Sequence, residues 1–145
     1  MYIILSMGVT EKIVIKTVNR PDGKDIEALS GWFCKVFDLS NGRSAIEPLI
    51  LQEIANTSLK GDGTTSKMLN KKLSVPRSTV IYHLNRFIYS GLVIRRGRKY
   101  FLRSNDMVST LEDLQGEILR EFSRLIEFAE KMDEIIEGGI DERGE

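Results

Sequence analysis

Residues 64–103 read TTSKMLNKKLSVPRSTVIYHLNRFIYSGLVIRRGRKYFLR, and the spacing of apolar, polar and glycine residues in this stretch decides the fold. Apolar residues three and four apart predict a short helix, which either of the two threonines at its start can cap. After a Ser-Val turn, Pro76 suits the first position of a second helix, where its missing N–H costs little. Two short β-prone runs then flank Gly97. The stretch therefore predicts two helices joined by a tight turn, followed by a β-hairpin.

Each of the two predicted helices has an apolar side and a polar side. The first directs Met68, Leu69 and Leu73 inward, and its outward lysines are Lys67, Lys71 and Lys72. In the second, the residues expected inward are Val80, Ile81, Leu84, Phe87 and Ile88. Its opposite face carries Arg77, Ser78, Thr79, Tyr82, His83 and Arg86. This face has no carboxylate, and its side chains are of the types that contact bases and phosphates in the major groove.

A basic hairpin is expected after the second helix. Ser90 and Gly91 end that helix, because glycine readily takes the left-handed conformation of a C-terminal cap. Two short strands follow, in which the residues expected to pack inward are Val93, Tyr100 and Leu102. The residues expected to reach the flanking DNA backbone are Arg95, Arg96, Arg98 and Lys99. Four cations around one glycine exceed what solubility requires.

The formal net charge of zero conceals a strong segregation along the chain. Residues 1–59 carry 6 Lys and Arg against 7 Asp and Glu, residues 60–103 carry 11 against 1, and residues 104–145 carry 4 against 13. The middle segment is thus +10 and the last segment −9. A nucleic-acid footprint is a property of one face rather than of the whole chain. The basic segment therefore favours a nucleic-acid partner.

Residues 44 to about 103 resemble the winged helix-turn-helix domain of ArsR-type and MarR-type transcriptional regulators. The residues that follow the pattern of that group are Ser78, Thr79, Val80, His83, Leu84, Phe87, Gly91, Leu92 and Val93. The resemblance implies a recognition helix at about residues 76–90 in the major groove. It also implies a wing at residues 94–101 on the DNA backbone or in the minor groove. Metal-sensing ArsR proteins commonly carry a cysteine pair in the preceding helix, and residues 64–73 contain none, so thiolate metal sensing is not expected.

Some polar residues of this segment have two interpretations. His83 either contacts DNA or is a polar residue of the core, and no nucleophile or orienting carboxylate near it in sequence indicates catalysis. Tyr82 either reaches DNA or packs against the wing. The wing arginines either bind the backbone or only solvate the hairpin.

The N-terminal segment, residues 1–43, contains two apolar runs and one amphipathic pattern. The second run, around Ile13, is rich in β-branched residues and favours a strand. Residues 24–38 repeat apolar positions at helical spacing, so we expect a helix that packs Trp32 and Phe33 in the core.

A further helix is expected from about residue 44 to Asn56. Ser44 and Glu47 have the spacing of a capping box at its start. Its apolar side is formed by Ile46, Leu49, Ile50 and Ile54.

The composition argues against several classes of protein. Cys34 is the only cysteine, so no intramolecular disulfide can form, and one histidine leaves a Cys/His metal site short of ligands. We expect Cys34 to act as a small hydrophobic residue in the core. No apolar run approaches the roughly 20 residues of a membrane span, and the first run is too short for a signal peptide. A cytoplasmic protein that is not an enzyme, without cofactor or metal, is therefore expected.

The acidic last segment predicts one long helix at residues 105–138. Its apolar seam, expected at a dimer interface, consists of Leu111, Leu114, Ile118, Phe122, Leu125, Ala129, Met132 and Ile136. Four more residues, Leu119, Ile126, Phe128 and Ile135, widen the stripe beyond a two-stranded coiled coil. This helix either packs back on residues 24–38 or pairs with a second copy, and we favour a dimer that uses both surfaces. Residues 139–145 are expected to fray.

The combined prediction is a mostly α fold with a small β-wing. A winged helix-turn-helix domain at residues 44–104 precedes the long C-terminal dimerisation helix. The expected function is sequence-specific binding of double-stranded DNA by a homodimeric transcriptional regulator. Two alternatives stay open: a winged-helix scaffold that binds a protein, and a regulator whose small-molecule effector sits between the helix carrying Trp32 and the tail. The operator, any effector, the sign of regulation, the role of residues 1–23 and the natural start, Met1 or Met7, also stay open.

Overall fold

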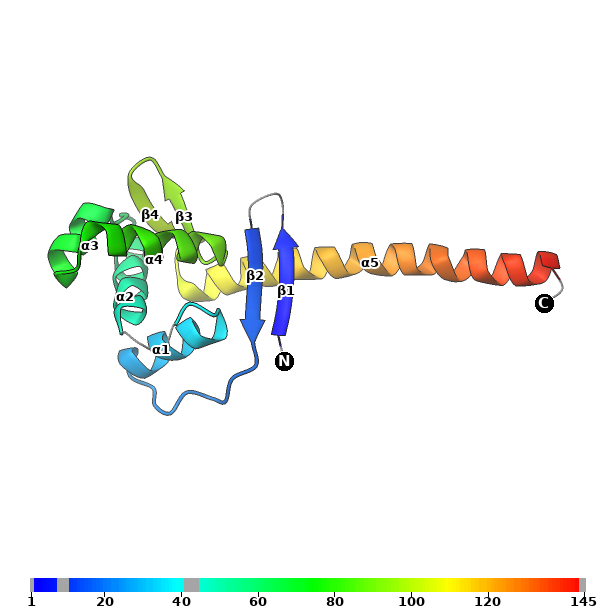
Figure 1. Ribbon diagram of the computed structural model, residues 1–145, viewed down its shortest axis with the longest axis horizontal. Helices are drawn as coiled ribbons and strands as arrows, with labels where there is room; N and C mark the ends of the chain where they lie inside the picture. Colours follow the sequence, from blue (N-terminus) through cyan, green and yellow to red (C-terminus); the bar gives the residue numbers. More distant parts are fainter. Residues whose placement is uncertain (1, 8–10, 41–44, 144–145) are drawn as a thin grey trace. The chain divides into compact units, whose positions relative to one another are not determined.

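Figure 1 shows the computed structural model, which describes residues 2–7, 11–40 and 45–143. The elements in chain order are β1 (Tyr2–Met7), β2 (Glu11–Lys16), α1 (Ile26–Val36), α2 (Ile46–Leu59), α3 (Ser66–Leu73), α4 (Arg77–Tyr89), β3 (Val93–Arg96), β4 (Lys99–Leu102) and α5 (Met107–Arg143). The chain divides into two units, residues 1–111 and 112–145. The expected mostly helical fold with a small antiparallel sheet and a long C-terminal helix is confirmed.

The N-terminal residues form an antiparallel hairpin of β1 and β2. Its Cα partners run from Tyr2 opposite Lys16 to Met7 opposite Glu11. The strand expected around Ile13 is thus confirmed, and the preceding apolar run forms its partner. β2 lies against α1 and α4, and Ile13 is fully buried.

The ends of α1 and α2 differ from those that apolar spacing alone indicates. α1 begins after Asp25, whose carboxylate accepts a hydrogen bond of 2.7 Å from the amide three residues on. It ends before Asp38, which takes φ = 58° in the left-handed region, so the helix is shorter than residues 24–38. Ser44, the expected cap of α2, lies outside the described residues, and α2 continues to Leu59.

The buried stripe of α2 includes polar as well as apolar residues. The buried residues are Glu47, Ile50, Leu51, Ile54 and Ser58. Leu49, expected inward, is exposed instead, because the buried stripe advances by three and four residues from Glu47. A carboxylate therefore faces the protein interior from α2.

The core of the first unit forms among α1, α2, α3, α4 and the β3–β4 hairpin. Its large, fully buried side chains include Ile50, Ile54, Leu69, Val80, Leu84, Phe87, Leu92 and Leu102. Cys34 belongs to this core, as expected. Trp32 and Phe33 were expected in it, but both are half-buried, with ring centroids 5.0 Å apart.

α3, a tight turn and α4 follow each other as expected, with Ser74 at φ = 54° between the two helices. Pro76 stands one residue before α4 rather than in its first position. Met68 and Ile81 were expected inward, but they are 54% and 37% exposed, so this prediction is wrong. In each helix, fewer residues face the core than its apolar residues predict.

The β3–β4 hairpin has the inward residues that the sequence predicts, Val93, Tyr100 and Leu102. Gly97 has φ = 61° in the two-residue loop, as a type II′ turn requires at its first position. A bridge missed from sequence joins this hairpin to the segment before α3: Thr64 N donates to Tyr100 O at 3.1 Å, and Tyr100 N donates to Thr64 O at 2.7 Å. The hairpin is thus fixed to the start of α3.

α5 begins after Asp106, whose carboxylate accepts a 2.7 Å hydrogen bond from the Ser109 amide. This hydrogen bond lowers the pKa of Asp106. The helix continues through Gly138 and Gly139 to Arg143. The fraying expected for residues 139–145 stays a prediction, and residues 144–145 lie outside the described residues.

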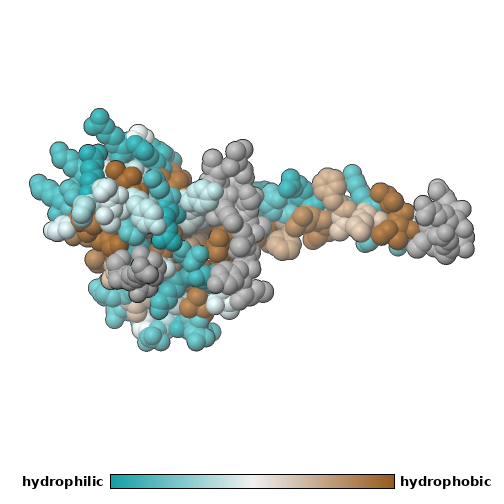
Figure 2. All heavy atoms as spheres, in the orientation of Figure 1, coloured by the Kyte–Doolittle hydropathy of each residue, from teal (hydrophilic) through white to brown (hydrophobic). Residues whose placement is uncertain are grey.

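Most of the apolar seam of α5 is open. Leu114 is buried, and Leu111 and Ile118 are half-buried. Beyond Ile118, the exposed apolar residues are Leu119, Phe122, Leu125, Ile126, Phe128, Ala129, Met132, Ile135 and Ile136. Apart from the alanine, they are 48% to 73% exposed, and Figure 2 shows hydrophobic side chains along the surface of this helix.

Gly63 offers a test of the contact between the hairpin and the segment before α3. A Cβ at Gly63 would lie 2.7 Å from Phe101 Cζ and 2.8 Å from Lys99 Cβ. Gly63→Ala should therefore destabilise the protein by about 1–3 kcal/mol, measured by urea unfolding. Gly31→Ala is the matched control, because apart from its chain neighbours and the backbone of its own helix no atom of the described residues lies within 4 Å of its Cβ position in α1. Equal stability of both variants would contradict the close contact.

Candidate nucleic-acid interface

α3 presents three lysines on its outer side. Thr65 caps the helix by accepting a hydrogen bond of 3.1 Å from the amide three residues on. Lys67, Lys71 and Lys72 are exposed, as expected. Lys72, however, forms a 2.8 Å ion pair with Glu53 of α2. Since that carboxylate neutralises Lys72, α3 offers mainly Lys67 and Lys71 to an anionic partner.

The N-terminal half of α4 carries the exposed polar side chains that the sequence predicts. Arg77, Ser78 and Tyr82 are exposed, and Thr79 is half-buried. Tyr82 is 59% exposed. Cζ of the Arg86 guanidinium lies over the Tyr82 ring, 5.9 Å from the centroid of that ring. No residue of α4 is acidic, so an anionic partner meets no repulsion from this helix itself.

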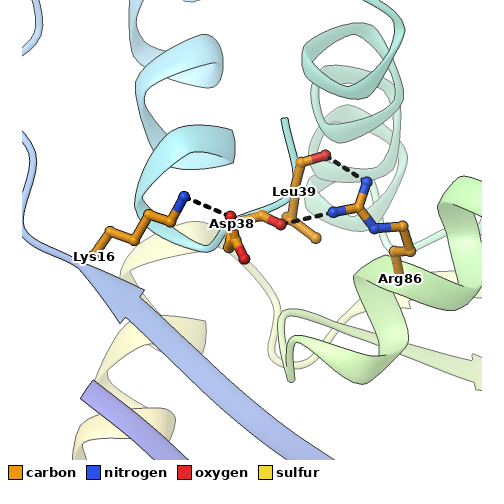
Figure 3. A network of polar contacts seen from close by, with 4 residues as sticks. All are labelled: Lys16, Asp38, Leu39 and Arg86. Carbon is orange, nitrogen blue, oxygen red and sulfur yellow. Dashed lines mark hydrogen bonds and ion pairs between the residues drawn. The ribbon is translucent and has the colours of Figure 1, made fainter. Parts of the chain in front are cut away.

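Two residues expected on this surface, His83 and Arg86, are turned toward the protein. His83 is 4% exposed, and its Nδ1 lies 3.7 Å from Oε1 of Glu47. Arg86 donates from Nη1 to the Leu39 carbonyl at 3.0 Å and from Nη2 to the Asp38 carbonyl at 2.7 Å (Figure 3). The two carbonyls satisfy the Arg86 guanidinium, whereas His83 Nδ1 makes no hydrogen bond within the described part of the chain. The prediction that both residues lie on the exposed face is therefore wrong, and His83 is a polar residue of the core.

The contacts of Arg86 belong to a network that joins three elements. Lys16 Nζ lies 2.6 Å from Oδ1 of Asp38, whose carbonyl accepts from Arg86 (Figure 3). β2, the residues after α1, and α4 are thus connected by polar contacts.

Sequence reasoning missed three exposed residues of α4, namely Ile81, Asn85 and Tyr89. Together with Ser78 and Tyr82 they follow one side of the helix at spacings of three and four. This helical spacing is visible in the sequence. The polar residues at positions 77–79, 82 and 83, by contrast, lie on two different sides of the helix. Asn85, whose amide both donates and accepts, therefore joins the candidate contacts.

The hairpin exposes four cations, Arg95, Arg96, Arg98 and Lys99, as predicted. The guanidinium of Arg95 lies over the Tyr100 ring at 5.6 Å, and that of Arg96 over the Phe101 ring at 5.6 Å. Lys99 forms a 3.1 Å ion pair with Asp62. The three arginines are therefore the main charges that the hairpin offers.

A hollow of about 510 Å³ opens where the hairpin meets the N-terminal ends of α3 and α4. It is lined by Thr65, Ser66, Lys67, Arg77, Arg95, Arg98 and Tyr100. Four of these seven side chains are cationic and none is acidic. We call it the hairpin hollow.

A second hollow, of about 400 Å³, lies beside α4. It is lined by Val14, Phe37, Asp38, Leu39, Tyr82, Asn85, Arg86, Tyr89 and Ser90. Its single cation, Arg86, already donates to two carbonyls, and Asp38 contributes an acidic group. This second hollow is thus mainly apolar and aromatic.

Burial shifts the pKa values of His83 and Cys34. Desolvation lowers the pKa of His83 from its ordinary value of 6.5, although the Glu47 carboxylate acts in the opposite direction. Desolvation, followed by the charge of Glu47, raises the pKa of Cys34 to about 12. The thiol therefore stays protonated at neutral pH and is a poor nucleophile and metal ligand.

Comparison of the chain with protein-family models, with curated proteins and with solved structures gave no match. In the described part of the chain, no group of three or more His, Cys, Asp or Glu side chains is arranged to hold a metal ion. Among residues 2–7, 11–40 and 45–143, no helix combines the length and the apolar character needed to cross a membrane. Function is therefore inferred from the residues and their geometry.

Mild acid should destabilise the fold through His83, the single histidine. Its pKa is lower in the folded than in the unfolded chain, so the unfolded state binds the proton first as the pH falls below 6.5. The contribution of His83 is complete above that pH and is lost as the pH falls toward its folded pKa. The loss proceeds at up to about 1.4 kcal/mol per pH unit. His83→Gln should remove this part of the pH dependence in urea unfolding at a series of pH values, and an unchanged slope would contradict the assignment.

Proposed function

We propose that the chain is a winged helix-turn-helix protein that binds double-stranded DNA sequence-specifically and regulates transcription as a homodimer. The observation that carries this proposal is one exposed cationic surface built from α3, the N-terminal half of α4 and the β3–β4 hairpin. All three elements come from the +10 segment of the chain. The two acidic residues paired with this surface, Glu53 and Asp62, are each bound to a lysine. Figure 2 shows hydrophilic side chains gathered over these elements.

The geometry supports a division of work within this surface. Ser78, Tyr82 and Asn85 lie on the exposed side of α4 and have the donors and acceptors needed to contact base edges in a major groove. Arg77 and the lysines of α3 flank them and supply contacts to phosphates, which fix register without reading sequence. The hairpin arginines extend the phosphate-contacting surface beyond the groove. The inward His83 and Arg86 hold α4 in this orientation.

The second part of the proposal is a dimer formed through α5. Its open apolar residues, from Leu119 to Ile136, would remain in contact with water in a single copy. Large exposed apolar patches commonly mark interaction sites. A second copy of α5 offers the same apolar stripe, and two-fold symmetry would present two recognition helices to half-sites about 34 Å apart.

DNA binding is tested by fluorescence anisotropy with site-selected duplexes at several salt concentrations. Log affinity should fall linearly with log salt, with a slope of about −0.9 for each phosphate neutralised. Ser78→Ala and Asn85→Ala should change the preferred sequence, whereas Lys71→Ala should weaken binding to all duplexes alike. A flat salt response would contradict the proposal and favour a protein-binding scaffold.

The dimer is tested by sedimentation equilibrium of Leu125→Glu. Because both copies lose a buried leucine, association should weaken by about 100-fold or more, from about 1.5 kcal/mol per side chain. Ser123→Glu is the matched control: Ser123 is also exposed on α5, but it lies outside the apolar stripe. A wild-type protein that stays monomeric, or equal association of both variants, would contradict a dimer through α5.

A further inference from the structure

The hairpin hollow concentrates positive charge from three different elements. Lys67 comes from the first turn of α3, Arg77 begins α4, and Arg95 and Arg98 come from the hairpin. Thr65 and Ser66 add hydroxyl groups at the start of α3. The positive end of the α3 helix dipole points to the same region. The hollow is therefore a convergence of donors and positive charge rather than a chance gap between side chains.

Two of the three arginines of the hollow, Arg77 and Arg95, are held in position by hydrogen bonds that leave most of their donors available. Arg77 Nε donates to Ser66 Oγ at 3.3 Å, and Arg95 Nε donates to the Gly97 carbonyl at 2.8 Å. Both bonds use Nε, so within the described part of the chain the Nη groups remain for a ligand. Arg95 is also stacked over Tyr100, which is buried and bonded to Thr64. The site is thus preorganised through the same bridge that fixes the hairpin.

Like charges that converge without a carboxylate repel one another, and an anion relieves this repulsion. A tetrahedral oxyanion suits the hollow best, because several oxygens can accept from guanidinium, ammonium and hydroxyl groups that approach from different directions. The second hollow lacks this character, since its Arg86 is committed to the carbonyls of Asp38 and Leu39. The chemistry therefore favours the hairpin hollow over the hollow beside α4.

We infer that the hairpin hollow is a binding site for one phosphate group, held jointly by α3, α4 and the hairpin. In the DNA-bound protein this group is a phosphodiester of the backbone, a step that rests on the proposed function. The same chemistry also accepts a free phosphate, and the second experiment distinguishes the two sources. Arg96 and Lys71 lie on the same elements but do not line the hollow, so each contacts a backbone phosphate singly, outside the shared site.

The first experiment compares alanine variants of equal charge change on the full-length protein. Lys67→Ala and Arg98→Ala remove cations that line the hollow, and Lys71→Ala and Arg96→Ala are their matched controls on α3 and the hairpin. Each hollow variant should weaken duplex binding by about tenfold or more, and each control by about threefold or less. Circular dichroism and urea unfolding establish that all four variants are folded.

The coupling between the two hollow residues gives a sharper readout. Because Lys67 and Arg98 contact the same phosphate, the effect of the double variant should differ from the product of the two single effects by about threefold or more. The Lys71→Ala/Arg96→Ala pair should combine multiplicatively. Equal losses for hollow and control variants, together with no coupling, would overturn the shared site in DNA binding.

The second experiment titrates inorganic pyrophosphate into the free protein and follows the backbone amides by ¹⁵N–¹H NMR. Saturable shifts at Ser66 and Lys67, lost in Arg98→Ala and kept in Arg96→Ala, support the phosphate site independently of DNA. If these shifts occur but the wild type binds no duplex, the site stands with a free phosphate as its source and the proposed DNA-binding function fails. If the wild type binds duplex without preference for the hollow residues and pyrophosphate gives no such shifts, the inference fails and the proposed function stands. If neither ligand binds, both fail.

Discussion

The rotation of α4 about its own axis controls which side chains this protein can present, and two inward polar contacts fix that rotation. His83 faces the buried carboxylate of Glu47, and Arg86 donates to the carbonyls of Asp38 and Leu39. Leaving the Arg86 guanidinium without its carbonyl partners would cost about 1–3 kcal/mol, whereas His83 Nδ1 makes no hydrogen bond within the described residues. Turning α4 by one residue would break both contacts at once. The inward contacts of α4 therefore determine which of its faces is exposed, and with it the candidate interface.

Local chemistry made much of the first unit predictable. The Thr65 cap, the turn before α4, the glycine after it and the inward residues of the hairpin all depend on near neighbours in sequence, and the structure contains each of them. Other features depend on residues far apart in the chain. The Glu47–His83 contact spans two helices, and the carbonyls that recruit Arg86 follow α1, so no spacing rule reveals them. For the same reason the sequence predicts the exposed Met68 and Ile81 inward. It shows that they are apolar, but not which part of each helix packs against the core.

Charge counting from the sequence overstated the free charge of the basic segment. Two of its lysines, Lys72 and Lys99, are paired with Glu53 and Asp62, and Arg86 bonds to backbone carbonyls. Exposed ion pairs of this kind contribute little to stability, about 0–1 kcal/mol. They do, however, reduce the unpaired cations of this surface to a smaller set of residues centred on the hairpin hollow. A partner therefore encounters a more sharply defined field than the net charge of +10 indicates.

The chemistry of Cys34 makes the chain ready for selective labelling. Its thiol is fully buried and its pKa is raised to about 12, so almost no thiolate is present at neutral pH. Maleimides and similar reagents react with thiolates that solvent can reach. A single cysteine introduced on the exposed side of α4 or at the hairpin turn would be modified in preference to the native one. Fluorophores or spin labels can therefore be attached to the wild-type background without first removing its own cysteine.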